Sequence, residues 1–129
     1  MGGMFAFVGS QYRLEVEGEE FFVDLLRFHR RLKSLVAIEL KVGSFQPEHV
    51  GKMQFYLAAL DDVVREEGEN PSIGIIVCKE KKRTIVEYAL RDAGKPIGVA
   101  TYAIKKTLPK ELRGQLPGPD EISKLLDGM

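Results

Sequence analysis

The sequence contains few of the residues from which cross-links and zinc sites are built. Its single cysteine, Cys78, excludes a disulfide within one chain, so we expect a reducing, cytoplasmic environment. Two histidines and one cysteine are too few for a structural zinc site. No apolar run approaches the roughly 20 residues of a membrane-spanning helix, and the N-terminus lacks the basic and apolar segments of a signal peptide. We therefore expect no association with a membrane.

Net charge is absent as well, because 19 basic residues balance 19 acidic residues. Proteins that bind nucleic acids usually carry a basic surface, although a neutral chain can still present a local basic groove. What the sequence does have is 44% hydrophobic residues over 129 positions, which is enough for one compact core. We therefore expect a single domain, which we place at residues 4–127.

The first third of the chain has the pattern of three strands. Phe5–Val16, Glu20–Arg30 and Ser34–Val42 are rich in apolar and aromatic residues. The turn Glu17-Gly18-Glu19 and a tight connection at Leu32-Lys33 separate them. Because parallel neighbours need a long crossover, strands with such short links predict an antiparallel meander.

The pattern then becomes helical. A helix is predicted from Pro47, which suits the first helical position, to Gly68, which can end it. The apolar residues that recur at helical spacing are Val50, Met53, Leu57, Leu60 and Val64. The apolar run Ser72–Cys78 follows, and it is typical of a strand covered on both faces.

In the last third of the chain, helix and strand patterns again follow one another. Thr84 and Glu87 fit a capping box, so a second helix is predicted to about Leu90. A strand is predicted at Ile97–Ile104, and a short helix after Pro117. The order is β-β-β-α-β-α-β with a C-terminal helix, a mixed sheet of the α/β (α+β) class. A right-handed crossover should make the fourth strand parallel to a strand of the meander.

Three charged residues interrupt the apolar strands. Asp24 lies within an apolar stretch, and Glu39 and Lys41 lie two residues apart in another, so the latter two share a face of the sheet. A buried carboxylate is costly unless it is paired or binds a metal. The alternative is a cross-strand ion pair on a solvated face.

The hairpin register decides whether the three residues meet. With an even connection, a loop at Arg31-Leu32 pairs Asp24 with Glu39, and one at Leu32-Lys33 pairs Asp24 with Lys41. Opposed residues share a face, so all three converge in either case. An odd connection or a bulge would place Asp24 on the other face.

Two carboxylates beside a lysine suit metal-assisted phosphodiester hydrolysis. Asp24 and Glu39 are hard oxygen ligands for Mg²⁺ or Mn²⁺, and the carbonyl of Leu40 is a candidate third ligand. A metal held there would polarise the phosphoryl group and acidify a water. Lys41 would orient that water or offset the charge that develops on the phosphate.

Several stretches of the chain together carry a family resemblance. They are residues 22–30, 35–43, 54–57, 69–79 and 86–91, and they resemble the C-terminal nuclease domain of the bacterial YhcG-like family, over about residues 4–127. The resemblance implies a restriction-endonuclease-like core, with Asp24 and Glu39 as metal ligands and Lys41 as the catalytic lysine of a PD-(D/E)XK site. It also implies that Gln54 lies beside the active site or the DNA.

The resemblance further implies segments that this sequence does not contain. Family members usually carry an N-terminal helical region for binding DNA or a partner. Many related nucleases also use an acidic residue from a helix before the first strand, which would have to lie upstream of Met1. We therefore expect the isolated domain to be weakly active or inactive.

Basic residues near the second and third predicted strands suggest a phosphate-binding patch. Arg27 and Arg30 lie close together in sequence, and Lys52 lies on the following helix. A solvated hairpin tip explains the two arginines equally well.

The expected function is cleavage of nucleic acid, with DNA as the expected substrate and a homodimer as the expected assembly. Two alternatives fit the same residues. One is a binding or dimerisation module on the same fold that does not cut. The other is a nuclease that recognises branched DNA, such as a junction, or RNA.

Overall fold

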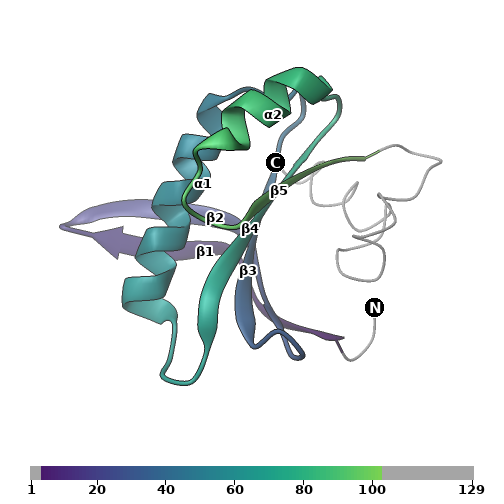
Figure 1. The fold of residues 1–129 in the computed structure, drawn as a ribbon. Helices are drawn as coiled ribbons and strands as arrows, with labels where there is room; N and C mark the ends of the chain where they lie inside the picture. Colours follow the sequence, from purple (N-terminus) through teal and green to yellow (C-terminus); the bar gives the residue numbers. More distant parts are fainter. Residues whose placement is uncertain (1–3, 103–129) are drawn as a thin grey trace.

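The computed structural model describes residues 4–102, which form a five-stranded sheet with helices packed against it (Figure 1). The elements in chain order are β1 (Phe5–Val16), β2 (Glu19–His29), β3 (Ser34–Leu40), α1 (Glu48–Ala59), a π-helical turn η2 (Leu60–Val64), β4 (Asn70–Cys78), α2 (Arg83–Arg91) and β5 (Ile97–Thr101). The predicted order of elements and the mixed α+β class are confirmed for this part of the chain.

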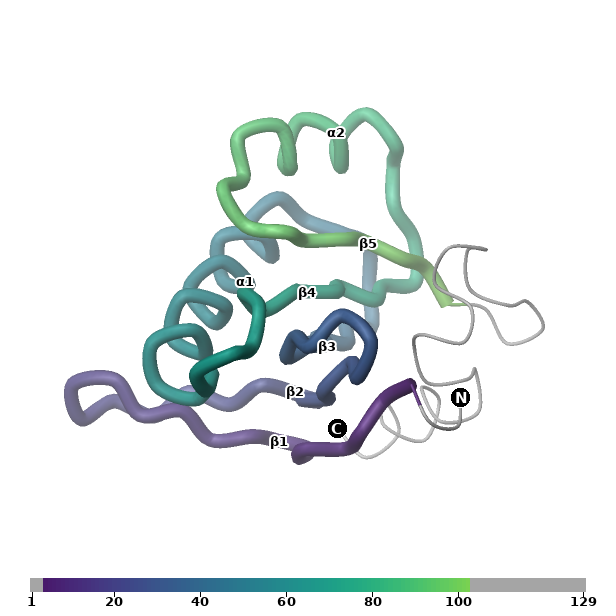
Figure 2. Tube along the Cα trace, turned by 60° about the horizontal axis from the view of Figure 1, so that its bottom comes forward, coloured from purple at the N-terminus to yellow at the C-terminus, as the bar shows by residue number. Residues whose placement is uncertain are grey.

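The strands lie side by side in sequence order, β1 to β5 (Figure 2). β1, β2 and β3 form the predicted antiparallel meander. β4 is parallel to β3, and β5 is parallel to β4. Each parallel step needs a crossover, and α1 and α2 provide these two connections. The predicted mixed sheet is therefore confirmed.

Local backbone chemistry accounts for the two hairpins. Glu17 and Gly18 have φ of 49° and 84°, and two consecutive positive φ values are what a two-residue type I′ turn requires. Lys33, at the end of the second connection, also has a positive φ of 53°. β3 ends at Leu40, two residues earlier than predicted. Lys41 still donates its N–H to the carbonyl of Val77, at 2.8 Å.

The helices differ from the sequence prediction in their first residues. α1 begins at Glu48, with Pro47 as its N-cap. The predicted capping box at Thr84 is wrong, because α2 begins at Arg83 and its N-cap, two residues before Thr84, is Lys82, which makes no side-chain capping bond. None of the helices described here is long and apolar enough to cross a membrane. The predicted C-terminal helix and the domain limit at residue 127 lie outside the described residues.

The larger core lies between the sheet and the helices. Its fully buried members include Leu26, Ala37, Met53, Leu57 and Ile76. A second apolar cluster occupies the opposite face of the sheet, with Leu25, Val36, Ile38, Leu40 and Val77. Each fully buried aliphatic side chain contributes about 1.5–3 kcal/mol. β4 contributes Ile76 to the first cluster and Val77 to the second, as its continuous apolar run predicted.

Close packing brings α1 onto the sheet. A Cβ atom at Gly74 of β4 would lie 2.6 Å from Cγ of Met53 on α1, a distance that a real Cβ does not adopt. Glycine therefore allows the helix to approach β4 closely. This approach carries the first turns of α1 over the end of β3, where the charged residues lie.

Candidate active site

The register between β2 and β3 places Asp24 opposite Glu39. Leu25 pairs with Ile38 and His29 with Ser34, with no shift between them. Residues 30–33 form the connection, which is even, as the convergence of the three residues requires. The paired residues end at Leu25 and Ile38, so Asp24 and Glu39 are the next residue of each strand. Ala37, the partner of Leu26, lies in the core beneath α1, so alternation along β3 puts Glu39 on that face. Alternation along β2 is interrupted at Asp24, because Val23 and Leu26 belong to the same core. The charge of Asp24 acts on Lys52 and Tyr56 of α1, which places this carboxylate on the helix side as well.

The two carboxylates are tied to each other's strand by hydrogen bonds. The backbone N–H of Asp24 donates to Oε2 of Glu39, at 2.8 Å. The backbone N–H of Leu40 donates to Oδ2 of Asp24, at 2.9 Å. Hydrogen bonds between a backbone N–H and a carboxylate are strong, so both side chains are held in fixed orientations, close together.

Glu39 is a buried carboxylate with cations beside it. Its residue is only 3% exposed, and burial raises its pKa, as does the negative charge of Asp24. The N–H of Asp24 and the charges of Lys41 and Lys52 act in the opposite direction. Nζ of Lys41 lies 3.8 Å from Oε1 of Glu39, and Nζ of Lys52 lies 4.0 Å from the same oxygen.

α1 contributes a further set of side chains to this site. Lys52 lies over the ring of Tyr56, with Nζ 5.6 Å from the ring centroid, and burial raises the pKa of the tyrosine. Burial and the nearby charge of Lys41 lower the pKa of His49. Sequence reasoning assigned His49 and Tyr56 to ordinary helix and core positions. Their spacing with Lys52, at i, i+3 and i+7, is the pattern that would have placed all three on one helix face.

A buried Glu39 and a half-buried Asp24, with lysines beside them, therefore lie on two interior strands of the sheet, next to α1. A sequence model described as the YhcG PDDEXK nuclease domain matches residues 1–117. The chain belongs to this family. Glu39-Leu40-Lys41 fits the E-X-K part of that description.

A named relative of this YhcG nuclease domain is the Escherichia coli (strain K12) protein called "Putative nuclease YhcG". The two are 43% identical over 113 residues, which is 88% of this chain. The chain spans 30% of the length of that relative. No solved structure matches the chain.

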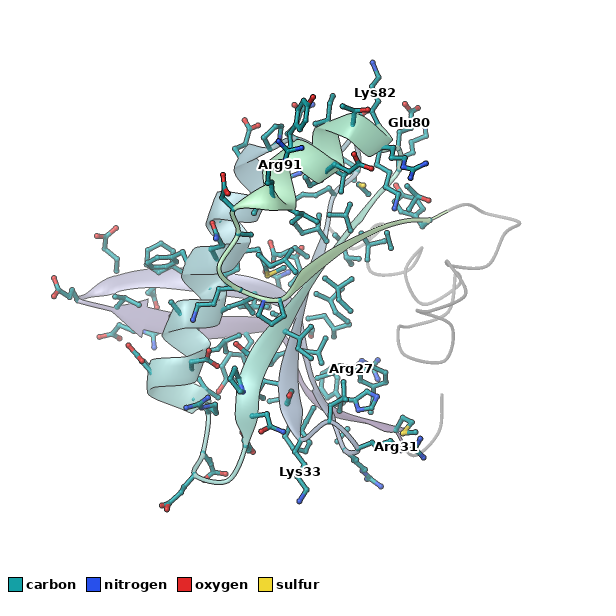
Figure 3. The ribbon with its side chains drawn as sticks, in the orientation of Figure 1. Arg27, Arg31, Lys33, Glu80, Lys82 and Arg91 are labelled. Carbon is teal, nitrogen blue, oxygen red and sulfur yellow. The ribbon has the colours of Figure 1, made fainter. Side chains whose placement is uncertain are left out.

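The YhcG nuclease domain does not bring every predicted site residue to the carboxylates. At about 100° per residue, Gln54 lies roughly 200° around α1 from Lys52, on the other flank of the helix. Arg27 pairs with Val36 and belongs to the face away from α1, where its guanidinium lies 5.9 Å from the ring centroid of Phe7. Figure 3 shows it at the end of the sheet that also carries Arg31 and Lys33.

Arg30 lies toward that same end of the sheet. It follows His29, whose partner Ser34 is five residues from Glu39 along β3, or roughly 17 Å in an extended strand. A patch that joins Arg27, Arg30 and Lys52 is therefore not formed on one surface. Separate roles for the arginines and for Gln54 in binding nucleic acid stay predictions.

The donor set of this YhcG nuclease domain suits a hard divalent cation. The residues described contain no group of three or more histidine, cysteine, aspartate and glutamate side chains that would hold a metal by themselves. Asp24 and Glu39 supply two carboxylates. The N–H of Leu40 faces Asp24, and in an extended strand the carbonyl of the same residue faces the same neighbour. Mg²⁺ is commonly held by one or two carboxylates together with waters, so these residues fit Mg²⁺ or Mn²⁺.

Glu39→Gln should raise the stability of the metal-free YhcG nuclease domain. The raised pKa means that the ionised carboxylate is less favourable in the folded chain than in the unfolded chain. A neutral amide removes this penalty, and we expect a gain of roughly 0.5–2 kcal/mol, the usual range for a stabilising substitution. Thermal unfolding in EDTA measures this gain in stability. Glu67→Gln, at an exposed position, is the control.

The pH dependence of the same comparison has a defined sign. The folded carboxyl keeps its proton to a higher pH than the ordinary value of 4.5, so its contribution to stability falls as the pH rises through the raised pKa. The gain in stability from Glu39→Gln should therefore grow as the pH rises from 4.5 through the raised pKa of Glu39, and it should be smallest below pH 4.5. A variant that is less stable than wild type at pH 7 would contradict this account of Glu39.

Proposed function

We propose that this domain hydrolyses phosphodiester bonds of DNA with a divalent cation, Mg²⁺ or Mn²⁺, held by Asp24, Glu39 and the carbonyl of Leu40. Membership of a nuclease family supports nucleic acid as the substrate. The observation that carries the proposal is the pair of carboxylates fixed on one face by backbone N–H groups, at 2.8 and 2.9 Å. Glu39 is buried and Asp24 is half-buried, so the pair concentrates negative charge that a divalent cation would neutralise.

A cation held there would supply positive charge to polarise the phosphoryl group and would acidify the attacking water. Asp24 and Glu39 are the residues that would hold it. Lys41 lies beside Glu39 with 22% of its side chain exposed, so its ammonium group can donate to the attacking water or to a phosphate oxygen. Water then adds to phosphorus as the bridging P–O bond breaks, leaving a phosphate monoester and a hydroxyl.

Lys52 has a different part in the proposal. Its side chain is half exposed, at 51%, and it reaches Glu39 from α1 while resting on the ring of Tyr56. A half-exposed lysine beside the reacting centre is suited to contact a phosphate of the bound strand. We assign Lys52 to substrate binding, and Lys41 to the reaction itself.

The assembly and the surroundings of the domain form the second part of the proposal. Two copies acting together would cut both strands of a duplex, so we propose a homodimer. The relative is much longer than this chain, and we propose that an N-terminal helical region adds binding to DNA or a partner. Cys78 is buried, and burial raises the pKa of its thiol, which suits a reduced, cytoplasmic protein.

The proposal is tested by cleavage of supercoiled plasmid, single-stranded RNA and a four-way DNA junction. Each is incubated with Mn²⁺, with Mg²⁺ and with EDTA. We expect cleavage of plasmid with either cation, complete loss in EDTA, and recovery when Mn²⁺ is added in excess. Equal cleavage in EDTA contradicts a metal mechanism, and cleavage of RNA alone contradicts DNA as the substrate.

Two outcomes of the same assay favour the alternatives. Cleavage confined to the junction identifies a structure-specific nuclease. Binding of plasmid without cleavage under any condition identifies a binding module.

A further inference from the structure

Gln11 has an unusual backbone conformation for a residue inside a strand. Its φ is 47°, in the left-handed region, although it lies in the middle of β1 and is not glycine. Such a conformation costs a residue with a Cβ roughly 1–3 kcal/mol. Gln11 is exposed, so burial of its side chain does not offset that cost.

The position of Gln11 is defined by the register between β1 and β2. Ser10 pairs with Leu25 and Tyr12 with Val23, which sets Gln11 opposite Asp24. The strained residue therefore lies directly across from one of the two carboxylates. Irregular residues in strands often re-aim a side chain beside an active site.

The side chain of Gln11 does contact that carboxylate. Its Nε2 donates to Oδ1 of Asp24, at 3.3 Å. The other oxygen, Oδ2, accepts the N–H of Leu40, at 2.9 Å. Donors from the strands on either side of β2 therefore fix the plane of the Asp24 carboxylate: one from β1 and one from β3.

We propose that Gln11 is a positioning residue for the metal ligand Asp24. The left-handed backbone at Gln11 directs its amide to Oδ1, and this bond holds the carboxylate in the orientation that binds the cation. The inference rests on the proposed metal site at Asp24 and Glu39. Groups that hydrogen-bond a metal ligand typically change metal affinity or activity by about 10–100-fold when they are removed.

Two substitutions at this position separate the side chain from the backbone. Gln11→Ala removes the amide and keeps the strain of a Cβ at positive φ. Gln11→Gly removes the amide and relieves the strain, because glycine adopts positive φ freely. We expect both to weaken binding of Mn²⁺ by about 10-fold or more in calorimetry. In EDTA, Gln11→Gly should unfold at a temperature equal to or above that of wild type.

Arg13→Ala is the matched control. Arg13 is exposed two residues further along β1, and its side chain contacts Glu15 and Glu20. Its substitution should leave Mn²⁺ affinity unchanged. If Gln11→Ala and Gln11→Gly bind Mn²⁺ as tightly as wild type, the positioning role is wrong. If wild type itself shows no Mn²⁺ binding, the proposed metal site fails instead, so the two failures are told apart in one series.

Discussion

Lys41→Met should lower the single-turnover rate of DNA cleavage by about 10²–10³-fold, which is the usual loss when one group that stabilises transition-state charge is removed. Lys41 lies 3.8 Å from Glu39 at the end of β3, where its ammonium group would meet the reacting phosphate. Met keeps the length of the aliphatic stem and removes the charge. Binding of Mn²⁺ should persist, because both carboxylates remain.

Lys95→Met is a matched control for this experiment. Lys95 also pairs with a carboxylate, that of Asp61, at 3.6 Å, and it lies away from the candidate site. Its substitution should leave the cleavage rate close to that of wild type, because this partly buried pair joins Lys95 to Asp61 and not to the carboxylates of the candidate site. Cleavage by Lys41→Met at the wild-type rate would remove Lys41 from the mechanism.

Asp24→Asn should abolish Mn²⁺ binding and greatly slow cleavage while leaving the fold intact. The amide oxygen of asparagine can still accept the N–H of Leu40, so the bond between the strands can persist. The lost charge removes one of two carboxylate ligands. At a Mn²⁺ concentration 100 times its Kd, wild type should gain about 2.7 kcal/mol of stability, and the variant should gain none.

The expected loss of rate is large. A catalytic metal contributes several kcal/mol of transition-state stabilisation, and each 1.36 kcal/mol corresponds to a factor of ten, so cleavage should fall roughly 1000-fold. Asp61→Asn is the control, because Oδ1 of Asp61 also accepts a backbone N–H, that of Ser72, at 2.9 Å. A thermal shift with Mn²⁺ that is the same in Asp24→Asn and wild type would exclude Asp24 as a ligand.

The convergence of the charged residues was predictable because it depends on simple geometry. Strand side chains alternate with a period of two, and a short connection leaves few possible registers. An even connection between β2 and β3 makes Asp24 and Glu39 neighbours, and residues 30–33 provide it. The sequence does not mark the irregularity of β2 at Asp24, where Val23 and Leu26 face the same core, and hydrogen bonds hold the two carboxylates together there. The continuous apolar run of β4 likewise predicted a strand buried on both faces.

Other features depend on angles that the sequence does not specify. The rotation of α1 about its axis decides that Lys52, and not Gln54, faces Glu39. The left-handed conformation of Gln11 is not marked by glycine or asparagine, the residues that usually adopt it. Arg27 was grouped with Lys52 by sequence proximity and charge, whereas strand alternation alone sends it to the opposite face of the sheet.

The most direct test of the proposed site is a crystal structure of the domain soaked in Mn²⁺, with anomalous scattering recorded to locate the metal. The account predicts a manganese peak in contact with carboxylate oxygens of both Asp24 and Glu39, within about 2.5 Å of each. The same soak of Asp24→Asn should show no peak there. A wild-type domain that cleaves DNA with Mn²⁺ but binds the metal elsewhere, with nothing between these two carboxylates, would contradict the account.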